Sequence, residues 1–218
     1  DIGGFPEKAL VRGDSNPGRI HMSVGGVGYN VACNASRLGL NVELCAPLGG
    51  DITAALVERS CRENRVGLRY ARRFPEENMS AYIFIADGRG DMVAAINDMD
   101  ILARMTPEVM RDVRLSKEDC DLAVIDANLP AETIAYLAER LTVPIFAEAV
   151  SAAKVCRLKS SLRRLHALKL NRLEAEALTG RSISGLEEAK LAVRALLGMG
   201  VRQVYLTLGA EGVCCGEG

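Results

Sequence analysis

The sequence predicts an α/β protein with a mostly parallel sheet covered by helices on both faces, and with a small β appendage. Two observations predict the sheet. Beyond residue 120, apolar runs without alternation recur, as expected for strands buried on both faces. Segments with helical periodicity separate these runs. The appendage is predicted by Gly-rich turns and hairpin patterns within the first hundred residues.

The composition is that of an ordinary globular protein, and it excludes several functional classes. The chain has 218 residues, 49% hydrophobic and 25% charged, enough to bury a sizeable core. A net charge of −1 and an aromatic content of 4% argue against nucleic acid as a partner. No apolar run approaches the ~20 residues of a membrane span, so we expect no membrane partner.

The cysteine pattern argues against zinc and against disulfides. The seven cysteines include no Cys-x-x-Cys pair, and only two histidines accompany them. Apolar settings such as Leu44-Cys45-Ala46 are typical of buried, reduced thiols, which predicts a cytoplasmic protein. The chain starts at Asp1 without an initiator Met, so we expect it to begin inside a longer protein.

The first hundred residues are expected to carry short strands, two helices and a hairpin. Val31, Ala35 and Leu38 share one face of the first helix and predict its buried side. The expected strands are 9–11, 19–22 and a buried strand at 40–48; the helices are 30–38 and 54–63; the hairpin joins 80–86 to 92–96.

From Thr106 onward, helices and strands alternate. Thr106-Pro107 predicts a helix start with proline in the first position. Ser184 and Glu187 have the spacing of a capping box and predict the start of the last helix. The expected strands are 122–126, 143–147, 165–170 and 201–208, and the expected helices are 130–141, 174–178 and 186–197.

Three turns are candidate ligand sites, because ligands of such sheets bind outside the carboxyl ends of the strands. The first is Gly25-Gly26-Val27-Gly28-Tyr29-Asn30. Its glycines allow a ligand to approach the backbone, and Asn30 offers a donor and an acceptor to a diol. The same spacing equally fits a plain glycine-rich turn in which Asn30 caps the following helix.

The other two turns suit phosphates, although each also has a structural interpretation. Asn171 and Glu174 share a helical face and could hold hydrated Mg²⁺, or simply begin a helix. Thr207, Gly209 and Gly212 could cradle a phosphate, or form a tight connection between strands. Lys154 follows a strand end and is either a ligand-facing cation or a solvated side chain.

The glycines of the first turn also raise the hypothesis of a dinucleotide-binding oxidoreductase, but two positions argue against it. Gly26-x-Gly28 begins the dinucleotide fingerprint, but Val31 stands where its last glycine belongs. Glu43 comes too early for the acidic residue that contacts the ribose.

Together, the three turns resemble the motifs of the PfkB family of sugar kinases, typified by ribokinase. The matching motifs are Gly25-Gly26-Val27-Gly28-Tyr29-Asn30, Asn171-x-x-Glu174 and Thr207-Leu208-Gly209-Ala210-Glu211-Gly212, and the resemblance covers essentially the whole chain. It implies a ribokinase-like three-layer α/β/α fold. We expect a single domain over residues 1–218, incomplete at both ends, with lid segments at about 1–24 and 79–98.

Three further segments resemble the pseudouridine kinases within this family. They are Asp14-Ser15-Asn16-Pro17-Gly18, residues 95–102 and Ala149-Val150-Ser151-Ala152-Ala153-Lys154. The resemblance implies Mg²⁺- and ATP-dependent phosphorylation of the 5′-hydroxyl of pseudouridine, or of a related nucleoside or sugar. The product would be pseudouridine 5′-phosphate.

The resemblance also implies roles for individual residues. Those expected to contact the substrate are Asp1, Gly25, Gly26, Asn30 and Lys154; those expected at the nucleotide are Asn171, Glu174, Thr207, Gly209 and Gly212, with Glu174 also organising Mg²⁺. A monovalent cation and a homodimer through the lid are further family features. The family's catalytic Asp is expected beyond Gly218, so no residue here takes that role. The alternative is a non-catalytic nucleoside- or sugar-binding relative.

Overall fold

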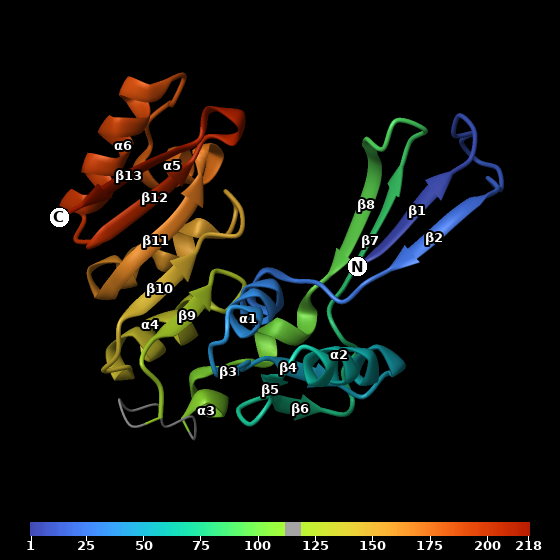
Figure 1. The fold of residues 1–218 in the computed structure, drawn as a ribbon, viewed down its shortest axis with the longest axis horizontal. Helices are drawn as coiled ribbons and strands as arrows, with labels where there is room; N and C mark the ends of the chain where they lie inside the picture. The colour runs from blue at the N-terminus through green and yellow to red at the C-terminus, as the bar shows by residue number, and fades with distance from the viewer. Residues whose placement is uncertain (112–118) are drawn as a thin grey trace. The chain divides into compact units, whose positions relative to one another are not determined.

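The computed structural model describes residues 1–111 and 119–218, which divide into two compact units (Figure 1). Unit 1 comprises Asp1–Arg104 and unit 2 comprises Met105–Gly218. In the described part of the chain, no helix is long and apolar enough to cross a membrane.

Unit 1 contains a four-stranded sheet in the order β2-β1-β7-β8. Its strands are β1 (Ile2–Pro6), β2 (Gly18–Met22), β7 (Ala81–Ala86) and β8 (Met92–Asp98). β7 and β8 form the predicted antiparallel hairpin, and β1 runs parallel to β7. The sheet therefore joins both segments in which the sequence predicted an appendage.

The strand predicted at residues 9–11 is wrong, and β1 forms earlier in the chain instead. Gly3 and Gly4 in β1 read as turn residues in the sequence. A Cβ at Gly3 would lie only 2.6 Å from the ring of Phe84, so glycine at this position leaves room for that ring. This packing involves a residue of β7, far away in the sequence, so the residues around Gly3 do not indicate it.

The remainder of unit 1 packs two helices with short strands. The elements are α1 (Val27–Arg37), β3 (Val42–Glu43), β4 (Pro47–Gly49), α2 (Ile52–Glu63), β5 (Val66–Gly67), β6 (Arg72–Phe74) and the 3₁₀ helix η1 (Asp100–Arg104). The single strand predicted at 40–48 is wrong: β3 pairs with β5, and β4 pairs with β6. Pro47 has no N–H to donate to a ladder, which favours a break there.

The helix predicted at 30–38 forms as α1, but it begins three residues earlier, at Val27, and buries a different face. Ala32 and Cys33 are the buried residues of α1, and they pack with Cys61 and Val66. Leu38 is 84% exposed and Val31 is 38% exposed, so the predicted apolar face does not enter this core. Small side chains let α1 pack closely against its neighbours.

Unit 2 is built on a five-stranded sheet in the order β13-β12-β11-β10-β9. Its strands are β9 (Ala123–Asp126), β10 (Ile145–Glu148), β11 (Leu165–Asn171), β12 (Gln203–Thr207) and β13 (Val213–Glu217). The ladders joining β9 to β12 are parallel, as predicted, and β13 adds an antiparallel edge, as the interpretation of the third turn as a connection between strands required.

The helices of unit 2 pack side by side, with α6 against β12 and β13. They are α3 (Pro107–Met110), α4 (Ala131–Arg140), the 3₁₀ helix η2 (Val155–Arg164), α5 (Arg172–Thr179) and α6 (Leu186–Gly198), and a further 3₁₀ helix is η3 (Gly209–Glu211). The N-cap predicted at Thr106 is confirmed, because its side chain accepts from the Val109 N–H.

The capping box predicted at Ser184 is wrong. Gly185 is the N-cap of α6 and makes no side-chain cap. The N–H of buried Ile183 donates to the Glu176 carboxylate at 2.6 Å, which fixes the chain's approach to the helix and leaves Ser184 exposed. A capping box does form in this unit, at Asn171 and Glu174.

The cysteines only partly match the prediction of buried thiols. All seven are free, and Cys33 and Cys61 are buried. Cys156 and Cys215 are exposed, so the prediction is wrong for these two.

Candidate substrate and nucleotide sites

The first candidate turn places glycine at the start of α1. Gly26 is the N-cap residue, with φ 97° and ψ 141°, a region that side-chain-bearing residues rarely adopt. No side chain caps this helix, so the N–H groups of its first turn are not satisfied in that way. The turn therefore offers backbone donors to an oxygen-rich ligand.

Asp1 lies directly against this turn. Its backbone pairs with Ser23 through two hydrogen bonds of 2.8 and 3.0 Å. A Cβ at Gly25 would lie 1.9 Å from Asp1 Oδ2, so in this structure the carboxylate occupies the space that a side chain at residue 25 would need. The structure thus brings Asp1 together with Gly25 and the adjacent Gly26, a combination of acceptor and donors that suits a diol.

Asn30 lies one turn into α1. Its N–H donates to the carbonyl of Gly26 at 2.9 Å, so it is not the cap that the structural interpretation required. The residue is exposed, and its side-chain amide makes no hydrogen bond to any residue in 1–111 or 119–218. The amide is therefore available to a ligand.

The second turn is a reciprocal capping box at the start of α5. Glu174 Oε2 accepts from the Asn171 N–H at 2.7 Å, and Oε1 accepts from Asn171 Nδ2 at 2.8 Å. Asn171 Oδ1 accepts in turn from the Glu174 N–H at 3.0 Å. Glu174 is only 2% exposed, so these bonds compensate a buried carboxylate. They hold both predicted residues in one arrangement.

The third turn lies beside the second. Thr207 is the register partner of Asn171 across the parallel ladder. Thr207 Oγ1 donates to the carbonyl of Leu170 at 3.3 Å. Gly209 and Gly212 both have positive φ, 64° and 96°; Gly209 begins η3, between β12 and β13, and Gly212 follows it. The structure therefore brings the five predicted nucleotide residues to one edge of the sheet, within a tight connection between strands.

Magnesium fits these strand ends only if waters and phosphates supply most of its ligands. In the described residues, no cluster of three or more His, Cys, Asp or Glu could hold a metal ion. The Glu174 carboxylate accepts two hydrogen bonds and retains further lone pairs. Mg²⁺ usually keeps several waters and is shared with substrate phosphates, so one carboxylate beside a phosphate site is a compatible donor set.

Lys154 is held by Asn128, a residue that the sequence analysis missed. Its Nζ donates to Asn128 Oδ1 at 2.7 Å. Arg157 donates to the carbonyl of Asn128 at 2.8 Å and also to the carbonyls of both neighbouring residues. Val150, just after β10, has a strained φ of 67°, and such strain often marks functional segments. The detectable signal was a polar residue, Asn128, shortly after a strand end.

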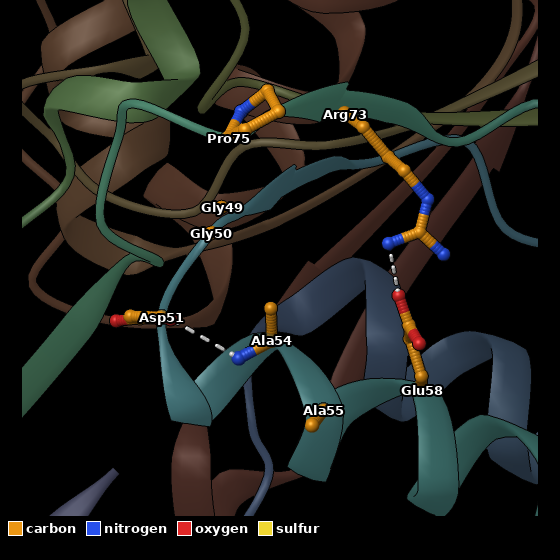
Figure 2. Close-up of a pocket in the computed structure, with 8 residues that line it drawn as sticks. All are labelled: Gly49, Gly50, Asp51, Ala54, Ala55, Glu58, Arg73 and Pro75. Atoms are coloured by element: carbon orange, nitrogen blue, oxygen red, sulfur yellow. Dashed lines mark hydrogen bonds and ion pairs between the residues drawn. The ribbon is translucent and has the colours of Figure 1, made fainter.

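A separate cavity of 240 Å³ in unit 1 lies where β4 meets α2 (Figure 2). It is lined by Gly49, Gly50, Asp51, Ala54, Ala55, Glu58, Arg73 and Pro75. Arg73 points at Glu58, 2.6 Å away, and the two charges neutralise each other.

Asp51 is the N-cap of α2 and borders this cavity. Burial acts to raise the pKa of Asp51, but hydrogen bonds from Thr53, Ala54 and Met79 outweigh it and lower that pKa. The carboxylate is thus engaged in holding the start of the helix, and the cavity presents no free charge to a ligand.

Comparison with known proteins adds independent evidence. The model of the pfkB family of carbohydrate kinases matches residues 2–218. The chain is 33% identical to pseudouridine kinase of Escherichia coli, and the match covers 98% of this chain and 68% of that protein. It is also 33% identical to an uncharacterized sugar kinase of the same organism, covering 100% of this chain and 60% of the relative.

A solved structure shows the same fold. A carbohydrate kinase from Agrobacterium tumefaciens superposes with a TM-score of 0.87 at 32% identity, covering all of this chain and 69% of the other. The ribokinase-like α/β fold expected from the sequence is thereby confirmed.

Proposed function

Because the chain belongs to the pfkB family of carbohydrate kinases, we propose that the protein transfers the γ-phosphoryl group of ATP to the 5′-hydroxyl of pseudouridine. The observation that carries this proposal is the position of the Asp1 carboxylate directly against the glycine turn at the start of α1. The choice of pseudouridine is supported by the 33% identity to pseudouridine kinase of Escherichia coli.

Unit 1 would bind the ribose of the nucleoside. The Asp1 carboxylate accepts from ribose hydroxyls, and the N–H groups beside Gly25 and Gly26 donate to them. The side-chain amide of Asn30 adds a donor and an acceptor. In unit 2, Lys154 is oriented by Asn128 and would offer its remaining ammonium hydrogens to a ligand oxygen.

Unit 2 would bind the nucleotide. Gly209 and Gly212 let phosphate or ribose approach the backbone, and Thr207 contributes a hydroxyl. Asn171 and Glu174 would orient hydrated Mg²⁺ beside the phosphates. When bound, Mg²⁺ neutralises part of the charge of the phosphates. The contribution of this chain's residues is positioning, which is the main catalytic requirement of phosphoryl transfer.

The four-stranded sheet of unit 1 would serve as a lid and as a contact with a second copy of the chain. Ile20 and Ile96 are 76% and 74% exposed, and Met22 and Ile83 on the same face are also exposed. Such an apolar face favours association. Light scattering should show a dimer that Ile96→Lys dissociates; an unchanged mass would contradict pairing through this face.

We also propose a cytoplasmic location.

The experiment is ADP release by the full-length protein with ATP and Mg²⁺, tested against pseudouridine, uridine, ribose and fructose 6-phosphate. Release with pseudouridine above the others supports the proposal. Release with another acceptor would support kinase activity but would refute pseudouridine as the substrate. Binding of pseudouridine without ADP release would favour a non-catalytic binding protein.

A further inference from the structure

One ion pair links the two turns of the proposed nucleotide site. Arg172, the first residue of α5, reaches the turn after β12, where its NH2 atom lies 2.8 Å from Glu211 Oε2. The Arg172 side chain is 32% exposed and that of Glu211 is 60% exposed. This pair connects segments 39 residues apart.

The surroundings of this pair are those proposed for the nucleotide phosphates. Arg172 directly follows Asn171, and Glu211 stands between Gly209 and Gly212. Asn171 and Thr207 are partners in the ladder, so the pair spans two adjacent strand ends. Among residues 1–111 and 119–218, one mostly exposed carboxylate therefore holds this guanidinium at the strand ends.

This inference rests on the proposed function. We propose that Arg172 is a nucleotide-binding residue: when the nucleotide binds, the Arg172 guanidinium leaves Glu211 and binds a phosphate oxygen. Glu211 then acts as an internal competitor for that guanidinium. The planar fork of arginine suits phosphate in two-point contact, and a polyphosphate carries more charge than one carboxylate. The Glu211 carboxylate is mostly exposed, and water screens an ion pair with such a partner, so the exchange costs little. Gly209 and Gly212 have no Cβ, so the backbone of this turn can adjust to the movement.

A static clamp is the competing explanation, and it predicts a different sign. If the pair only stiffened the two turns, removal of either partner would weaken nucleotide binding. If Glu211 competes with phosphate, removal of its charge should strengthen binding, whereas loss of Arg172 should weaken it.

The experiment is calorimetric titration of the full-length protein with ADP and Mg²⁺. The variants are Arg172→Gln, Glu211→Gln, the double variant, and Glu187→Gln as a control. Glu187 pairs with Lys190 on α6, with its side chain 78% exposed, and has no proposed role. Circular dichroism and thermal melting verify that each variant folds.

We expect Arg172→Gln to raise the Kd for ADP about tenfold, the loss of one charge-assisted contact. We expect Glu211→Gln to lower it about two- to fivefold, the ratio that an exposed ion pair corresponds to. In the double variant, Glu211→Gln should no longer lower the Kd for ADP. The control Glu187→Gln should leave the Kd unchanged.

Weaker binding in both single variants, or unchanged binding in both, would overturn the exchange. Equal tightening by Glu211→Gln with and without Arg172 would also overturn it, because Glu211 would then act only as a nearby negative charge. If the wild-type protein binds no ADP, the proposed function falls first. ADP binding with the wrong signs leaves the function standing and removes only this inference.

Discussion

Replacement of Glu174 by Gln tests whether the capping box holds the second turn. Both carboxylate oxygens of Glu174 accept from Asn171, one from its backbone N–H and one from Nδ2. Gln keeps the size of the side chain but replaces one of these oxygens with an NH₂ group. Whichever way the new amide lies, a donor then faces a donor. Rotation of the Asn171 amide gives no escape, because it would break the bond from the Glu174 N–H.

The cost follows from burial. Glu174 is 2% exposed, so water cannot replace the lost acceptor. Leaving a buried donor unsatisfied costs about 1–3 kcal/mol, and we expect Glu174→Gln to lower the free energy of unfolding of unit 2 by this amount. Relief from burying a charge offsets part of this cost, which favours the lower half of the range.

The assay is urea unfolding followed by circular dichroism, combined with amide hydrogen exchange at residues 171 and 174. Glu187→Gln on α6 is the matched control, because the side chain of Glu187 is 78% exposed. The control should change stability by less than about 0.5 kcal/mol. A Glu174→Gln variant as stable as this control, with undiminished protection of both amides, would refute the reasoning.

Two further predictions concern titratable groups in unit 1 and exposed thiols in unit 2. Burial raises the pKa of Cys45 to about 11, so iodoacetamide at pH 8 should label exposed Cys156 and Cys215 first; early modification of Cys45 in the folded protein would contradict this. The pKa of Asp51 is lowered by hydrogen bonds that outweigh burial, so its charge stabilises the fold above the unfolded pKa of about 3.9. This contribution is lost as the pH falls through the folded pKa, so Asp51→Ala should cost more stability at pH 7 than in acid; equal costs would exclude the shift.

Features that depend on nearby residues are the ones that sequence reasoning predicts. Thr106-Pro107 begins α3 as predicted, because this cap depends only on residues next to it in the sequence. The β7–β8 hairpin follows for the same reason, since its turn lies between its strands. The three candidate turns all appear at the ends of regular elements, as their residue types predicted.

Features that depend on distant partners could not be predicted in this way. Gly3 belongs to β1 because Phe84 covers it, and Ser184 loses its cap role because Glu176 binds the preceding residue. Among the site residues, Asn128 was missed although it follows a strand end, because its role depends on Lys154 and Arg157 from other segments. Contacts of this kind, between segments far apart in the sequence, can be seen only in the folded structure.

The central claim is that unit 1 binds a nucleoside and unit 2 binds a nucleotide. The most direct test is calorimetric titration of the full-length protein, Asn30→Ala and Asn171→Ala with pseudouridine and with ADP and Mg²⁺. Asn30→Ala should weaken pseudouridine binding by about 1–3 kcal/mol and leave ADP binding unchanged, because only the nucleoside loses a partner. Asn171→Ala should do the reverse. Unchanged pseudouridine affinity in Asn30→Ala, or unchanged ADP affinity in Asn171→Ala, would contradict the account.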